Sequence, residues 1–83
     1  MKLSEQEIYD KLKNILIDKF ELKESAITPD ANLYQDLGLD SIDAVDLAIR
    51  VQELTGKRIE RQEFQDVRTV RDMVKTAYKL FNE

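Results

Sequence analysis

The sequence predicts an all-α fold: a bundle of four helices, the third of them short, with a long loop between the first two. Strong helix formers (Leu, Lys, Glu, Gln, Ala) are frequent, whereas only two Gly and one Pro occur among the 83 residues. Apolar residues recur at helical spacing in three segments, and each segment has a capping residue at its start. The length and the 42% apolar content predict one folded domain over residues 1–83.

The first helix is predicted to begin near Ser4 and to end near Phe20 or Glu21. Ser4 and Glu7 have the spacing of a capping box, in which each side chain accepts a hydrogen bond from the other residue's backbone. One face of this helix then carries the apolar residues Ile8, Leu12, Ile15, Leu16 and Phe20.

Residues 21–40 show no sustained periodicity and contain Pro29, Asn32 and Gly38. They are predicted to form a long ordered loop, a feature that is often functional in a compact domain. Around Leu33–Leu37 the chain could form a short helical turn. Scattered apolar side chains are expected to hold the loop to the core, namely Leu22, Ile27, Leu33, Leu37 and Leu39.

The second helix is predicted over Ser41 to Thr55. Asp40 or Ser41 can be its N-cap, Asp43 lies in the first turn where negative charge is favoured, and Gly56 supplies a stop. One side carries Val45, Ala48, Ile49 and Gln52, and Ile42, Leu47, Val51 and Leu54 extend the apolar surface.

Two further helices are predicted after Gly56. A short one is expected around Arg61–Val67, anchored by Ile59, Phe64 and Val67. The last begins after Thr69, which has Asp72 three positions on as in a capping box. Its inner face is predicted to consist of Val70, Met73, Val74, Ala77, Tyr78 and Phe81.

The composition excludes several kinds of chemistry. The chain has no Cys and no His, which removes disulfides, thiolate nucleophiles, Ser–His relays and zinc sites built from those residues. No apolar run approaches the roughly 18 residues of a membrane span, and the start of the chain is polar and acidic, unlike a signal peptide. We therefore expect a cytoplasmic protein. Its net charge of −4 argues against general nucleic-acid binding.

The most informative segment surrounds Ser41, at the junction of the loop and the second helix. No Lys or Arg occurs from Ala26 through Ile49, whereas this stretch contains five Asp residues. On spacing alone, Asp40 and Ser41 are helix-capping residues and the other carboxylates form a solvated face. Helical periodicity by itself does not make Ser41 a modification site.

The run Leu37-Gly38-Leu39-Asp40-Ser41-Ile42-Asp43 resembles the Leu-Gly-x-Asp-Ser-[Leu/Ile]-Asp signature of acyl carrier proteins. The order of helices and loop resembles that family over nearly the whole chain. The resemblance implies that a phosphopantetheinyl transferase joins the Ser41 hydroxyl to 4′-phosphopantetheine from coenzyme A, with Asp40 beside it. The thiol of the arm would hold an acyl chain as a thioester, which suits a chain without Cys.

The resemblance also implies a docking strip on the second helix, made of acidic and apolar side chains: Asp40, Ile42, Asp43, Val45, Asp46, Ile49 and Glu53. Core packing is an equal alternative for Val45 and Ile49. The core, or a cavity for a short acyl chain, is expected to be lined by Leu47, Val51, Ile59 and Val74. The expected partners of this monomer are the transferase and the acyl-transferring and chain-elongating enzymes of fatty acid, modified-lipid or polyketide-type synthesis.

Arg50 and Gln52 interrupt the acidic run that the family usually keeps along the second helix. A second departure is a basic stretch from Lys57 to Arg71, with five basic and three acidic residues. It indicates either a specialised partner set or a surface of ion pairs without functional consequence.

The alternatives for function are a peptidyl or aminoacyl carrier and a helical adaptor without a prosthetic group. An enzyme is the weakest interpretation, because Asp40, Asp43 and Asp46 offer too few ligands for a catalytic metal. We therefore predict no catalytic or metal site.

Overall fold

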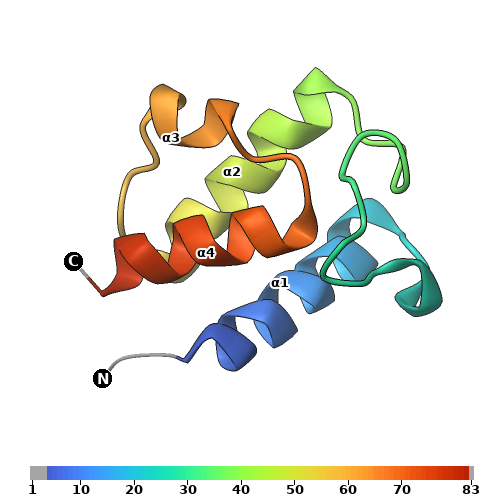
Figure 1. The fold of residues 1–83 in the computed structure, drawn as a ribbon, viewed down its shortest axis with the longest axis horizontal. Helices are drawn as coiled ribbons and strands as arrows, with labels where there is room; N and C mark the ends of the chain where they lie inside the picture. The colour runs from blue at the N-terminus through green and yellow to red at the C-terminus, as the bar shows by residue number, and fades with distance from the viewer. Residues whose placement is uncertain (1–3, 83) are drawn as a thin grey trace.

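The computed structural model describes residues 4–82, which form four α-helices (Figure 1). These are α1 (Glu5–Phe20), α2 (Ser41–Thr55), α3 (Arg61–Gln65) and α4 (Val70–Phe81). Helix α4 packs most extensively against α1 and also contacts α2 and α3. The predicted all-α bundle, with a short third helix and a long loop after the first, is confirmed.

Helix α1 begins and ends as the sequence predicts. Glu7 N–H donates to Ser4 Oγ at 3.1 Å and Ser4 N–H donates to Glu7 Oε1 at 3.3 Å, which completes the capping box. At the other end Glu21 adopts a left-handed conformation, with φ of 55°. The core face is formed by the buried side chains Ile8, Leu12 and Leu16 and the half-buried Ile15 and Phe20.

The loop between α1 and α2 is held to the core by the predicted apolar side chains. Ile27, Leu33, Leu37 and Leu39 are buried, and Leu22 is half-buried. The turn predicted near Leu33–Leu37 is present, because Asn32 O accepts hydrogen bonds from the N–H groups of Asp36 and Leu37, each at 3.0 Å. A 3₁₀-helix at Glu24–Ala26 was not predicted.

Backbone hydrogen bonds join this loop to the start of α4. Leu33 N–H donates to Arg68 O at 2.8 Å and Val70 N–H donates to Ala31 O at 3.0 Å. An isolated β-bridge pairs Asn32 with Thr69 between them. The segment that leads to Ser41 is therefore fixed against a part of the chain more than thirty residues away.

Two predictions for the last third of the chain are wrong in detail. Helix α3 ends at Gln65 rather than Val67, because Val67 leaves the helix to bury its side chain. On α4 Tyr78 is 36% exposed, whereas Leu80 is buried. Leu80 follows Ala77 by three residues and Met73 by seven, which places it on the buried stripe of the helix.

The capping box of α4 contains a carboxyl with a shifted pKa. Partial burial raises the pKa of Asp72, but hydrogen bonds outweigh this effect and lower it below 3.8. The backbone N–H groups of Thr69 and Arg68 each donate to Asp72 Oδ2 at 3.2 Å. The Thr69 hydroxyl and the positive charge of Lys75 act in the same direction.

Asp72 should therefore make the stability of the fold pH-dependent in the acid range. A carboxyl whose folded-state pKa lies below its unfolded value stabilises the fold above that unfolded value, and this contribution is lost as pH falls through the folded pKa. The Asp72→Asn variant should be less stable than the parent near neutral pH, and the difference should shrink below pH 3.8. Urea denaturation of both proteins at several pH values measures this. A difference that grows on acidification would contradict the assignment.

Candidate functional site

A single glycine shapes the approach to Ser41. Gly38 has a φ of 71°, in the left-handed region that side chains disfavour. No atom lies within 4 Å of the position that a Cβ would take, so glycine is favoured here by the backbone conformation and not by a lack of space. The flanking Leu37 and Leu39 are both buried, and Leu39 N–H donates to Leu33 O at 3.0 Å. The chain is thus fixed two residues before Ser41.

The N-cap of α2 is Asp40, and not Ser41. Asp43 N–H donates to Asp40 Oδ1 at 2.8 Å, and Asp40 N–H donates to Asp43 Oδ2 at 3.3 Å. Ser41 is the first residue inside the helix, is exposed, and has no side-chain hydrogen bond to residues 4–82. This decides between the two capping residues that the sequence left open, and it leaves the Ser41 hydroxyl available.

The outer face of α2 carries exposed apolar side chains. Ile42 is 78% exposed, Val45 57% and Ile49 46%, so core packing does not explain Val45 and Ile49. The opposite face buries Ala44, Leu47, Val51 and Thr55. Unpartnered apolar side chains of this size on one helix face are typical of a contact surface.

The carboxylates of this face are less uniformly exposed than the sequence suggests. Asp40 and Glu53 are exposed, whereas Asp43 is half-buried within the capping box. Asp46 is half-buried and forms an ion pair with Arg50, with Asp46 Oδ1 and Arg50 Nε 3.7 Å apart. The spacing of four residues on a helix could have revealed this pair in advance.

Two open depressions lie beside the face. The first has a volume of about 510 Å³ between α2 and α3, with Val45, Ala48, Ile59 and Phe64 in its lining. Four residues were predicted to line the core or an acyl cavity: Leu47, Val51, Ile59 and Val74. All four are buried, which confirms them as core residues, and Ile59 also lines this groove.

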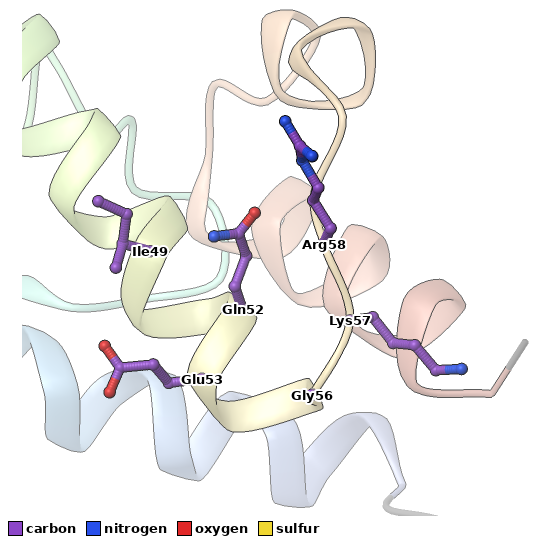
Figure 2. Close-up of a pocket in the computed structure, with 6 residues that line it drawn as sticks. All are labelled: Ile49, Gln52, Glu53, Gly56, Lys57 and Arg58. Atoms are coloured by element: carbon purple, nitrogen blue, oxygen red, sulfur yellow. The ribbon is translucent and has the colours of Figure 1, made fainter.

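The second depression, of about 470 Å³, lies at the C-terminal end of α2 and is lined by Ile49, Gln52, Glu53, Gly56, Lys57 and Arg58 (Figure 2). It brings two basic side chains next to the far end of the predicted docking strip. The sequence identified the basic stretch but not this placement.

Residues 10–77 match the protein-family model described as a phosphopantetheine attachment site. The chain is 45% identical over 78 residues to acyl carrier protein 2 of Ralstonia nicotianae, an alignment that covers 94% of this chain and 96% of that protein. The chain belongs to the acyl carrier protein family. It is also 39% identical over 72 residues to an acyl carrier protein of Coprothermobacter proteolyticus, covering 87% and 88% of the two chains. The fold matches the crystal structure of an acyl carrier protein from Thermotoga maritima, with a TM-score of 0.81, 24% identity, and coverage of 94% and 91%.

Acyl carrier proteins hold a covalent 4′-phosphopantetheine group and act as carriers without catalytic activity of their own. The start of α2 fits such a group, because it presents an exposed serine hydroxyl in a helix turn whose first N–H groups lack intrahelical acceptors. This end of a helix favours the negative charge of a phosphate. In the residues that the structure describes, no cluster of three acidic, His or Cys side chains could hold a metal ion. No helix among them is both long and apolar enough to cross a membrane.

Replacing Asp40 should separate its capping role from its charge. Asp40→Ala removes the acceptor for Asp43 N–H and should lower the free energy of unfolding by about 1 kcal/mol. Asp40→Asn keeps a side-chain acceptor and should cost much less, since Asn caps helices as well as Asp does. Urea denaturation of the three proteins provides the comparison. Equal losses in both variants would mean that charge, and not capping, is what Asp40 contributes.

Proposed function

We propose that Ser41 is the attachment residue, and that the protein carries acyl groups as thioesters on a 4′-phosphopantetheine arm. The observation that carries this proposal is the exposed Ser41 hydroxyl at the start of α2. This hydroxyl is not used as a helix cap, because Asp40 is the N-cap. When bound, the group supplies a terminal thiol, which this chain cannot supply because it has no Cys.

In the loading step this chain would supply the Ser41 hydroxyl as the nucleophile and hold it in a fixed position. The Ser41 oxygen would form a bond to phosphorus as the pyrophosphate bond of coenzyme A breaks, with adenosine 3′,5′-bisphosphate leaving. The hydroxyl proton would pass to a base of the transferase, because the nearest carboxylates of this chain, Asp40 and Asp43, already accept backbone hydrogen bonds in the capping box. Gly38 and the capping pair Asp40 and Asp43 hold the hydroxyl at a fixed place in the fold.

We further propose the outer face of α2 as the docking strip for partner enzymes, with the residues Asp40, Ile42, Asp43, Val45, Asp46, Ile49 and Glu53. The exposure of Ile42, Val45 and Ile49 supports this assignment, since a partner can cover them. The carboxylates would pair with Lys or Arg on the partner and speed encounter without tight binding. Partners of this kind are the phosphopantetheinyl transferase and the acyl-transferring and chain-elongating enzymes of fatty acid, modified-lipid or polyketide-type synthesis.

The proposed cargo is acyl rather than aminoacyl or peptidyl. The run Leu39-Asp40-Ser41 supports it, as do the curated relatives, which are named acyl carrier proteins. A monomer in the cytoplasm stays the prediction of the sequence.

Incubation with coenzyme A and a broad-specificity phosphopantetheinyl transferase tests the attachment. The intact mass should rise by one phosphopantetheine group for each chain. An unchanged mass with several different transferases would contradict the proposal and favour the adaptor without a prosthetic group.

A further inference from the structure

The basic residues Lys57 and Arg58 are held at a fixed place beside the end of α2. Gly56 ends the helix in a left-handed conformation, with φ of 70°. Lys57 N–H then donates to Thr55 Oγ1 at 3.2 Å, and Ile59 N–H donates to Gln52 Oε1 at 2.9 Å. The Ile59 side chain is buried. The backbone between these two anchors cannot move far from α2, so the position of the basic pair follows from the fold.

Neither Lys57 nor Arg58 forms an ion pair with any side chain that the structure describes. The ion pairs found among the described side chains are Lys13 with Glu24, Arg50 with Asp46, and Arg71 with Asp30. Both Lys57 and Arg58 are exposed. In the basic stretch, Arg71 thus has a structural role in fastening the loop, whereas Lys57 and Arg58 do not. An ion-paired surface therefore does not account for these two residues.

The pair extends the outer face of α2 and reverses its charge. Ile42, Asp46, Ile49 and Glu53 are separated by four, three and four residues and so follow one line along the helix, about 16 Å long at 1.5 Å for each residue. Figure 2 shows Ile49 and Glu53 on one side of α2 and Arg58 across from Gln52, whereas the Lys57 side chain extends from the segment after Gly56 toward the side away from Ile49. The strip carries acidic and apolar side chains from its Ser41 end to Glu53, with Asp46 paired to Arg50, and the surface beyond Gly56 is basic.

We propose that the partner enzyme of this carrier has a docking surface with the complementary order of charges: basic where the strip is acidic, and acidic where the strip is basic. It would present basic side chains toward Asp40 and Asp46, an apolar recess for Ile49, and acidic side chains toward Arg58 and Lys57. This inference rests on the proposed docking function of α2. A partner whose docking surface is basic throughout would meet like charges at the far end of the strip and bind more weakly. The order of charges also fixes the direction in which α2 docks, and hence the side on which Ser41 lies.

The test uses a ketosynthase of general fatty acid synthesis whose carrier-docking surface is basic throughout. Its affinity is measured by NMR titration of the ¹⁵N-labelled carrier, both unloaded and loaded. At an ionic strength of about 0.1 M, where the Debye length is about 10 Å, the variant Lys57→Glu/Arg58→Glu should bind about tenfold more tightly than the parent, and the gain should shrink at about 1 M. The control Lys11→Glu/Lys23→Glu makes the same charge change at exposed positions outside the strip. It should change the affinity less than about twofold, since distant charges are screened.

Equal affinities for the parent and the Lys57→Glu/Arg58→Glu variant would overturn the inference. An equal gain in the control variant would also overturn it, because the effect would then reflect net charge alone. Intact mass separates these results from a failure of the proposed function. If the chain gains the arm but shows either affinity result, the proposed carrier function stands and only the inference about docking fails. If the chain never gains the arm, the proposed carrier function itself fails.

Discussion

The Ser41→Ala variant should gain no mass with coenzyme A and a phosphopantetheinyl transferase, while the parent protein converts fully. The alanine lacks the oxygen that would bind phosphorus, so the loss should be complete rather than partial. The fold should be almost unaffected, because Asp40 and not Ser41 caps α2. Thermal denaturation should therefore show nearly the same midpoint for the two proteins. If Ser41 were the cap, the variant would lose about 1 kcal/mol of stability.

The chain offers a matched control for this experiment. Its three serines are Ser4, Ser25 and Ser41. Ser25 is exposed, within the 3₁₀-helix, and lies far from the motif in sequence. The Ser25→Ala variant should load like the parent. Loading of the Ser41→Ala variant would contradict the assignment, and its loss in a Ser25→Ala variant would move the attachment site to Ser25.

The Leu33→Ala variant should cause the largest loss of stability among single changes in the loop. Leu33 is fully buried, so its removal costs transfer free energy and leaves a cavity, together about 3 kcal/mol. For a domain of this size the midpoint of thermal unfolding should fall by roughly 12–24 °C. Calorimetry or circular dichroism measures the change. A loss below about 1 kcal/mol would show that the loop is not part of the cooperative core.

The next residue along the chain is the natural control. Tyr34 is 38% exposed, and its backbone N–H donates to Asn32 Oδ1, a bond that substitution of the side chain leaves intact. Tyr34→Ala should therefore change the free energy of unfolding by about 0.5 kcal/mol or less. The contrast between adjacent positions separates burial from a general effect of altering the loop.

Local signals in the sequence were enough to predict the long helices. Spacing alone reveals the capping boxes at Ser4 and Thr69, because they join residues three positions apart. It also reveals the helix end at Gly56, because glycine readily adopts the left-handed conformation found there. Whether Tyr78 or Leu80 is buried depends on which side of α4 packs against the rest of the bundle, and the helical pattern does not specify this. The same holds for the end of α3, where burial of Val67 overrides the helix.

The candidate site was predictable in its residues but not in its arrangement. The motif indicated Ser41, yet Asp40 and Ser41 are equally good caps in sequence, and only hydrogen-bond geometry separates them. An apolar residue such as Val45 could be core or surface until the packing of α2 was known. The placement of Arg58 depends on the bond from Ile59 N–H to Gln52, a contact across seven residues that no pattern predicts.

The backbone bonds between the loop and the start of α4 have a consequence for the order of folding. The loop can reach its native course only when Arg68 and Val70 are available to pair with it. Closing a chain segment of this length costs entropy before the contacts repay it. Helix α1 can form early from local contacts, but the turn that presents Ser41 should order late, together with α4. During synthesis, a modifying enzyme that recognises this turn should act only after the last helix has emerged from the ribosome.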